Sequence, residues 1–289
     1  MKVFAALDDA ETVRKFYEKT EGRIKLNYLI SYYYLDGQAY RLTDEHKYKD
    51  MINELYLDSG AFSVAAGRSK ITVTEYSKYL NLFGDRFDQF FNLDDQFNNP
   101  EHNQDNLKYL EENLPQSPKK PIPVVHDNEN PFQEFSDYVN LDHDYIAIGS
   151  TINIPDDTMA QIKEKFPTVK IHLFGKIALR QLKTGYYYSA DSTTWSDAAG
   201  FGDILYWDPD EKEFHKIYMG STDRRDDESD HYKRFAKKDK VEAFLQDTFD
   251  FEYSDLLIKS GAYNRRIVNL YYYKQIEDYL TDLEATRST

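Results

Sequence analysis

The stretch 145–174, YIAIGSTINIPDDTMAQIKEKFPTVKIHLF, contains the pattern that decides the fold. An apolar run at 145–148 is followed by a segment of helix-forming composition at 156–166, and a second β-rich run follows at 170–174. A short apolar strand, a helix and another strand are typical of a parallel βαβ unit. The stretch therefore predicts a parallel sheet whose strands are joined by helices.

The same alternation extends over most of the 289 residues. Eight such strands in a chain of this length favour an α/β fold of the (β/α)8 TIM-type barrel class, which typically takes about 250 residues. An open doubly wound sheet is the alternative, and it is weakened because no GxGxxG or GxxxxGK turn follows a strand. The expected strands are 25–35, 55–57, 87–93, 122–125, 145–148, 170–174, 186–190 and 204–207.

The chain has no composition shift that demands an independent second domain. We expect a catalytic barrel over residues 1–222, which includes an opening helix at 8–22. Beyond it, residues 223–289 are expected to form a helical C-terminal extension packed on the barrel.

Composition excludes several classes of protein. There are 36 Lys+Arg against 51 Asp+Glu, which gives a net charge of −15, and there is no cysteine. Without cysteine, a disulfide scaffold, a thiolate nucleophile, an iron–sulfur cluster and a zinc site with sulfur ligands are excluded. We expect no metal and no cofactor. The apolar runs are much shorter than the roughly 20 residues of a membrane helix, and the first residues do not resemble an export signal, so we expect a cytoplasmic protein without membrane contact.

Polar side chains follow most of the expected strands. In a (β/α)8 barrel, the C-terminal ends of the strands form the rim that carries the active site. The carboxylates of Asp58, Asp94 and Asp191 are therefore predicted to converge, although an aspartate after a strand also commonly caps the next helix. The pairs in question are Asp58-Ser59, Asp94-Asp95, His126-Asp127, Gly149-Ser150, Gly175-Lys176 and Asp191-Ser192.

Converging carboxylates without thiols suit two kinds of chemistry. One is the binding of a hard metal ion by oxygen ligands. The other is glycosidic chemistry, in which one carboxylate attacks the anomeric carbon and a second handles protons. Composition alone does not choose between them. His126 and His172, at strand ends, are candidates for ligands or base contacts, and a structural role is equally compatible with the pattern.

Six strand-end words, read in order, resemble those of the tRNA-guanine transglycosylase superfamily. The most specific are DSGAF, and HLFG followed about sixteen residues later by ADS. The resemblance extends over roughly residues 50–210. The words are LDSGAFS (57–63), FNLDDQF (91–97), PVVHD (123–127), YIAIGS (145–150), IHLFGK (171–176) and SADSTTW (189–195).

This resemblance implies a (β/α)8 barrel that exchanges guanine in nucleic acid for a deazaguanine base through a covalent aspartyl–sugar intermediate. It implies that Asp191 is the nucleophile and Asp58 the general acid/base. A carboxylate suits the first role because it can attack and later leave. The implied base-binding residues are Phe62, which would stack on the base, Asp94, which would accept its N–H groups, Asp95, Gly149, Ser150, His126 and His172.

The chain departs from the tRNA-directed enzymes at several points. Because it has no cysteine, it lacks their Cys/His zinc module, and Ser63 and Ser150 replace a glutamine and a glycine of the family pattern. It is more similar to the phage-type branch that inserts deazaguanines into DNA, which implies action in the host cytoplasm.

The expected partners are DNA, with tRNA as the alternative, together with free guanine and a free deazaguanine base. Because the chain is acidic, we also consider a basic protein partner. Residues 231–240 and Arg265-Arg266 are either phosphate contacts or ordinary solvated helix faces. The alternatives to a DNA transglycosylase are a tRNA-directed relative, a hydrolase that uses the same carboxylates, and a catalytically silent barrel that serves as an interaction subunit.

Overall fold

A computed structural model describes residues 1–7, 9–35, 48–114, 117–220, 231–257 and 261–287. The chain divides into two compact units. The first unit comprises residues 1–10 and 27–192, and the second comprises residues 11–26 and 193–289. The expected boundary at 222 lies outside the described residues, and the division between the units instead follows residue 192.

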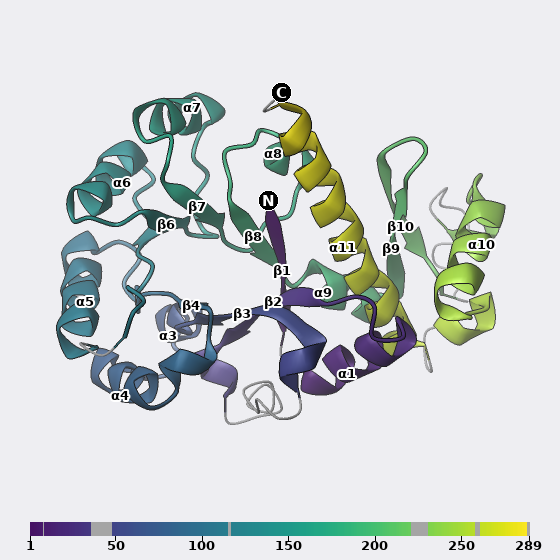
Figure 1. The fold of residues 1–289 in the computed structure, drawn as a ribbon, viewed down its shortest axis with the longest axis horizontal. Helices are drawn as coiled ribbons and strands as arrows, with labels where there is room; N and C mark the ends of the chain where they lie inside the picture. Colours follow the sequence, from purple (N-terminus) through teal and green to yellow (C-terminus); the bar gives the residue numbers. More distant parts are fainter. Residues whose placement is uncertain (8, 36–47, 115–116, 221–230, 258–260, 288–289) are drawn as a thin grey trace. The chain divides into compact units, whose positions relative to one another are not determined.

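The first unit is built on an eight-stranded parallel sheet with the order β4-β3-β2-β1-β8-β7-β6-β5. In Figure 1 the strands form an arc, and helices α4, α5, α6 and α7 lie along its outer side. The strands are β1 Lys2–Leu7, β2 Leu26–Ser31, β3 Ile52–Asp58, β4 Gln89–Phe90, β5 Val124–Val125, β6 Tyr145–Ile148, β7 Lys170–Leu173 and β8 Ser189–Ser192. The helices are α3 Ala61–Ala65, α4 Val73–Phe83, α5 Pro100–Asn113, α6 Pro131–Asn140, α7 Asp156–Lys165 and α8 Leu179–Leu182.

The two edges of this sheet are joined to each other. Phe91, next to β4, and Ile122, just before β5, form a parallel bridge. The N–H of Ile122 donates to the carbonyl of Phe90 and the N–H of Asn92 donates to the carbonyl of Ile122, each at 2.9 Å. The sheet is therefore curled, and its topology is compatible with a TIM-like fold.

Seven of the eight expected strands overlap strands of this sheet, but the eighth was placed wrongly. Residues 204–207 belong to β9 Asp203–Asp208, which pairs antiparallel with β10 Glu213–Tyr218 in a separate two-stranded sheet. The missing strand is β1, between β2 and β8. Val3, Phe4 and Ala5 of β1 are all buried. A strand buried on both faces shows no alternation of polar and apolar residues. The sequence of β1 therefore resembles that of residues 204–207.

Aromatic side chains fill the interior of the curled sheet. Phe4, Tyr56, Phe91 and Tyr145 belong to one buried cluster. The ring of His172 is fully buried and lies 5.0 Å from that of Phe91, between centroids. The interior of this sheet is therefore packed with side chains. Leu29, Ile122, Val124 and Ala147 complete the cluster.

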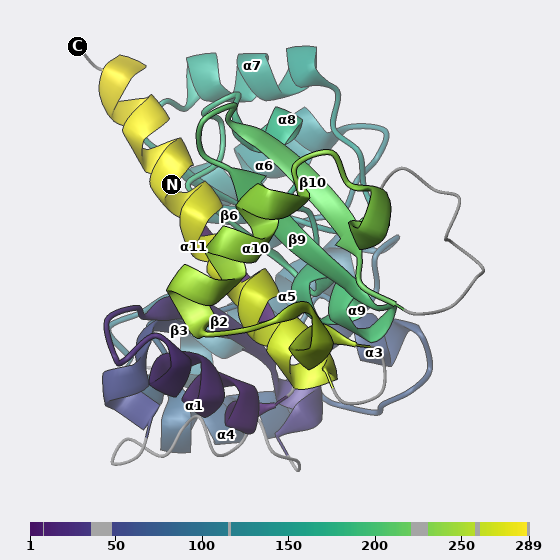
Figure 2. The ribbon, with the colours of Figure 1, turned by 90° about the vertical axis from the view of Figure 1, so that its right-hand side faces the viewer.

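The second unit combines helices with the β9–β10 hairpin, which Figure 2 shows. Its longest helix, α11, carries two buried polar residues that bind backbone atoms. Arg265 donates to the carbonyls of Ala199 (2.8 Å) and Leu256 (2.6 Å). Asn269 donates to the carbonyl of Trp195 and accepts the N–H of Leu205. The helices are α1 Ala10–Lys19, α9 Thr194–Gly200, α10 Lys238–Phe249 and α11 Ala262–Arg287.

Short 3-10 helices complete the regular structure of both units. They are Tyr32–Tyr34, Lys49–Met51, Gly84–Arg86, Tyr232–Arg234 and Tyr253–Leu256. The opening helix that was expected at 8–22 is α1, which is shorter, and residue 8 lies outside the described residues.

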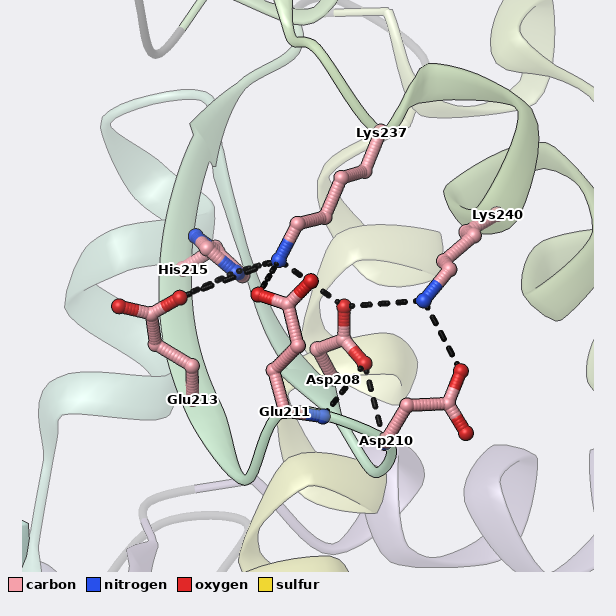
Figure 3. Close-up of polar contacts among 7 residues, drawn as sticks. All are labelled: Asp208, Asp210, Glu211, Glu213, His215, Lys237 and Lys240. Atoms are coloured by element: carbon pink, nitrogen blue, oxygen red, sulfur yellow. Dashed lines mark hydrogen bonds and ion pairs between the residues drawn. The ribbon is translucent and has the colours of Figure 1, made fainter.

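The hairpin and the start of α10 are joined by a network of charges, shown in Figure 3. The buried carboxylate of Asp208 accepts the N–H groups of Asp210 and Glu211 and hydrogen bonds from Lys237 (3.1 Å) and Lys240 (3.5 Å). Desolvation raises the pKa of Asp208, but Lys237 and the two N–H groups outweigh it and lower the pKa to about 2.

The sequence leaves open whether the basic residues of 231–240 and Arg265-Arg266 contact phosphate or only face solvent. Lys237 and Lys240, from the segment 231–240, are paired with carboxylates of the hairpin. Arg265 is only 1% exposed and is bound to carbonyl groups. These three residues therefore have structural partners and do not form a free basic surface.

Asp208→Asn is expected to destabilise the second unit by about 1–2 kcal/mol at pH 7, since the amide keeps an acceptor but loses the charge that binds two lysines. A carboxylate with a lowered pKa stabilises the fold above its ordinary pKa of 3.8 and loses that effect as the pH falls toward 2. Urea unfolding between pH 7 and pH 2.5 should show the two proteins converging. Asp210→Asn, at an exposed carboxylate, is the control and should have a smaller effect at pH 7. A difference between wild type and Asp208→Asn that is the same at every pH would contradict this prediction.

Candidate active site

The strands place the predicted carboxylates at one end of the curled sheet. Asp58 is the last residue of β3, Asp94 follows β4, and Asp191 lies near the end of β8. The negative charges of Asp94 and Asp191 both act on Asp58 and raise its pKa. Asp58 thus lies within electrostatic range of both other carboxylates.

Asp58 is the carboxyl group of the site whose proton affinity is most altered. Desolvation raises its pKa, as do the charges of Asp94 and Asp191, while hydrogen bonds from Ser31 and from the N–H of Gly60 lower it, and the result is about 7. The N–H of Gly60 lies 3.1 Å from Oδ2. A carboxyl group with such a pKa is present in both protonation states near neutral pH, so it can donate or accept a proton.

The turn that follows Asp58 requires a glycine. Gly60 has φ of +82°, and a Cβ there would lie 3.0 Å from Ile71 and 3.1 Å from Tyr33. Another residue would be strained in this conformation and would press on both neighbours. The sequence Asp58-Ser59-Gly60 is therefore explained by local structure. Its glycine allows the chain to turn back so that the Gly60 N–H donates to the Asp58 carboxylate.

Asp191 is held by groups of the neighbouring strand β7. Its side chain is nearly buried, and Oδ1 accepts the N–H of Gly175 at 3.1 Å. The same oxygen lies 3.2 Å from Nε2 of His172. Two nitrogen atoms therefore orient one oxygen of the Asp191 carboxylate.

Asp94 is paired with the second histidine that the sequence singled out. Its Oδ2 is hydrogen-bonded to Nε2 of His126, and both side chains are buried. Glu134 of α6 accepts the backbone N–H groups of His126 and Asp127, each at 2.8 Å, and so fixes this turn. Pairing of Asp94 with His126 leaves Oδ1 available to accept hydrogen bonds from a ligand.

Rings lie in series beside this pair. Phe97 stacks on His126, with ring centroids 4.4 Å apart and planes inclined by 24°. Phe62 is 54% exposed, and its ring lies 6.5 Å from that of Phe97 with an inclination of 27°. Phe97 was not chosen from the sequence, although it closes the quoted word FNLDDQF. No local signal distinguishes it from the many other phenylalanines, because its importance depends on the strand that carries His126.

The remaining predicted base-binding residues are placed differently. Oδ1 of Asp95 is bound to His102 (3.0 Å) and Asn106 (3.1 Å) of α5, so its carboxylate is engaged with that helix. Ser150 is exposed and lies beside Gly175. His172 is fully buried and contacts Asp191, so it can act on a substrate only through that carboxylate.

Gly149 follows β6 and lies against the ring of His126. Its role is to leave room for that ring. A Cβ at this position would lie 2.6 Å from both Cε1 and Nδ1 of His126. Only glycine allows the histidine ring to occupy its place beside Asp94. The requirement for glycine after β6 is thus explained by packing within the protein.

A pocket lies among the loops that follow β6 and β7. Lys176 links these loops by donating to the carbonyl of Ile152 at 2.7 Å. None of the three carboxylates lines the pocket, so we place the chemistry at the strand ends and not there. Its lining residues are Asn153, Ile154, Pro155, Asp156, Ala178, Arg180, Gln181 and Thr184.

In the described part of the chain, no group of three or more histidine, aspartate or glutamate side chains is arranged to hold a metal ion. Within the same residues, no helix has the length and apolar character needed to cross a membrane.

Comparison of the chain with models of known protein families gave no match, and comparison with curated proteins gave none either. The function is therefore inferred from the residues of the site and their geometry.

Gly149→Ala is expected to destabilise the first unit by about 1–3 kcal/mol, because the new methyl group overlaps the ring of His126. Urea unfolding of the full chain measures the change. Gly84→Ala is the matched control, since a Cβ there lies 3.8 Å from Leu80 in ordinary contact, and it should be neutral or slightly stabilising. If both variants were equally stable, the packing role of Gly149 would be wrong.

Asp58→Asn is expected to stabilise the protein above pH 7. The pKa of Asp58 is about 7 in the folded chain against an ordinary value of 3.8. Between these values the folded state keeps a proton that the unfolded state has lost, so wild-type stability falls as the pH rises from about 4 to 7. The variant lacks this loss and should gain about 1–2 kcal/mol over wild type between pH 4 and pH 8. Urea unfolding at several pH values tests this, and a constant difference would refute it.

Proposed function

We propose that this chain is a base-exchange transglycosylase that replaces guanine in DNA with a deazaguanine base. The observation that carries the proposal is the meeting, at the strand ends, of Asp58 with a pKa of about 7 and of the oriented carboxylate of Asp191. Base exchange on a sugar needs one carboxylate that attacks and another group that moves protons. The resemblance of the strand-end words to the transglycosylase superfamily supports the same assignment, including a (β/α)8 TIM-type barrel.

In the proposed first step, a carboxylate oxygen of Asp191 attacks C1′ of the target nucleotide. The bond between C1′ and N9 of guanine breaks, its electron pair goes to the base, and Asp58 in its acid form supplies the proton. The product is an ester between Asp191 and the sugar, together with free guanine. Because the pKa of Asp58 is near neutral, the acid form is well populated at physiological pH.

In the second step, Asp58 is a carboxylate and accepts the proton from N9–H of the incoming deazaguanine. The base nitrogen attacks C1′, and the ester bond breaks so that its electrons return to Asp191. Both carboxyl groups are then in their starting states. No group outside the chain, the nucleic acid and the two bases is needed to balance the exchange.

Asp94, Phe62 and Phe97 are the proposed base-recognition residues. The free Oδ1 of Asp94 can accept N–H groups such as those at N1 and at the amino group of guanine. The exposed ring of Phe62 offers a surface on which a planar base stacks. We assign Asp95 no role in recognition, because its carboxylate is bound to α5.

We propose DNA rather than tRNA as the substrate because the chain has no cysteine and so no Cys/His zinc module of the tRNA-directed enzymes. The proposed location is the cytoplasm, and that of the host if a phage encodes the chain. The net charge of −15 disfavours long-range attraction of DNA. Since Lys237 and Lys240 are paired with carboxylates, a basic protein partner is a proposed aid to DNA binding.

The test is incubation of the full chain with labelled guanine and either DNA or tRNA. The wild type should incorporate label into DNA and form a DNA adduct that survives a denaturing gel. Asp191→Asn should lose both, since an amide oxygen is a poor nucleophile. Asp58→Asn should slow exchange by about 100- to 10,000-fold. Asp210→Asn, in the hairpin of the second unit, is the control and should match the wild type.

Other outcomes would replace the proposal with a specific alternative. Label incorporated into tRNA but never into DNA would identify a tRNA-directed enzyme. Release of guanine without incorporation would identify a hydrolase. An adduct that persists in Asp191→Asn would exclude this residue as the nucleophile, and the absence of any reaction would favour a silent barrel.

A further inference from the structure

A chain of buried hydrogen bonds crosses the interior of the curled sheet and ends at Asp191. Tyr56 is hydrogen-bonded to Tyr145. Oη of Tyr145 lies 2.6 Å from Oγ of Ser189, which in turn lies 2.7 Å from Nδ1 of His172. Nε2 of His172 lies 3.2 Å from Oδ1 of Asp191. Four side chains on strands β3, β6, β7 and β8 therefore connect in a line to one carboxylate.

This line is sealed from solvent. His172 and Ser189 have no exposed surface, and Tyr56 is 2% exposed. The rings of Phe91 and Phe174 lie 5.0 and 4.7 Å from that of His172. Buried polar groups in an apolar core are costly unless they are hydrogen-bonded, so each member depends on its neighbours. No substrate can reach His172, and its effect must pass through Asp191.

For a neutral imidazole beside an ionised Asp191, the donors and acceptors along the line admit one consistent order. A carboxylate accepts but does not donate, so Nε2 of His172 must carry the hydrogen. In a neutral imidazole, Nδ1 is then an acceptor, and the hydroxyl of Ser189 must donate to it. Ser189 can accept from Tyr145, and Tyr145 from Tyr56. Burial raises the pKa of both tyrosines, so both hydroxyls keep the hydrogen that they donate.

We infer that this hydroxyl chain holds His172 as the Nε2–H tautomer and thereby positions the Asp191 carboxylate. His172, Ser189 and Tyr145 are positioning residues. The catalytic consequence of this inference rests on the proposed function, in which Asp191 is the nucleophile. The tautomer itself does not depend on that function and can be measured separately.

The other histidine–aspartate pair of the site lacks such a device. Nε2 of His126 meets Asp94, but Nδ1 of His126 is buried and has no hydrogen-bond partner among the described residues. The second nitrogen of His126 therefore receives no donor that selects a tautomer. Both histidines are buried, but Nδ1 of His172 has a hydroxyl partner and Nδ1 of His126 has none among the described residues. The hydroxyl chain is therefore a feature of the Asp191 side of the site and not of every buried histidine.

The first experiment reads the tautomer of His172 by long-range ¹H–¹⁵N NMR on the full chain. Its signals are assigned by their loss in His172→Gln. The wild type should show Nε2–H, and Ser189→Ala should weaken this preference, since Nδ1 then loses its donor while Asp191 still accepts from Nε2. Tyr28→Phe is the matched control, because the buried hydroxyl of Tyr28 has no hydrogen-bond partner among the described residues, and it should change nothing. An Nδ1–H tautomer in the wild type, or no response to Ser189→Ala, would overturn the inference.

The second experiment measures guanine exchange by the same variants. Ser189→Ala and Tyr145→Phe should lower kcat by about five- to tenfold, the effect of one hydrogen bond, with KM for the base unchanged. His172→Gln, whose amide can donate to Asp191 and accept from Ser189, should retain more activity than His172→Leu. A rise in KM with constant kcat would count against positioning of Asp191.

The two measurements separate failure of the inference from failure of the proposed function. The expected tautomer in a wild-type chain that exchanges no base with DNA or tRNA would refute the function and support the positioning of Asp191. Exchange by a chain whose His172 is in the Nδ1–H form would refute the positioning and support the function. Urea unfolding of each variant identifies any that lose activity because they do not fold.

Discussion

Desolvation of Asp58, reinforced by the like charges of Asp94 and Asp191, is the constraint on which the rest of the site depends. Burial and like charges both disfavour the ionised form of a carboxyl group, and both act on Asp58. Asp94 and Asp191 are each hydrogen-bonded to a histidine. Asp58 instead receives hydrogen bonds from Ser31 and the N–H of Gly60, and it retains a proton to about pH 7. The three aspartate side chains thus have different hydrogen-bond partners, and this allows them to perform different chemical roles.

The order of strands in the curled sheet makes this differentiation possible. Because β7 lies beside β8, His172 and Gly175 reach Asp191, which is 19 and 16 residues away in sequence. The bridge between Phe91 and Ile122 brings the strand before Asp94 next to the strand before His126. Without that junction of the two sheet edges, the Asp94–His126 pair would have no reason to form. The two aspartate–histidine pairs therefore depend on the strand order and on the junction of the two sheet edges.

Local features of the sequence predict the positions of the carboxylates but not their partners. Asp58, Asp94 and Asp191 follow apolar runs, and the preference of such ends for one rim of a parallel sheet is enough to place them together. Phe97 and the hydroxyls of Tyr145 and Ser189 gain their roles from neighbouring strands that are distant in sequence. The same limit explains why β1 was missed and 204–207 was chosen, since both are short apolar runs and only strand pairing distinguishes them.

A comparison of two aspartates shows that burial alone does not determine which residue becomes reactive. Asp208 and Asp58 both experience desolvation that raises the pKa, yet the pKa is about 2 for the first and about 7 for the second. Asp208 receives two backbone N–H groups and two lysines. Asp58 receives Ser31 and one N–H group and faces two like charges. At Asp58, desolvation is the largest cause and outweighs the donors, whereas at Asp208 the lysine and the N–H groups outweigh desolvation, so Asp58 is the carboxyl group able to exchange a proton at neutral pH.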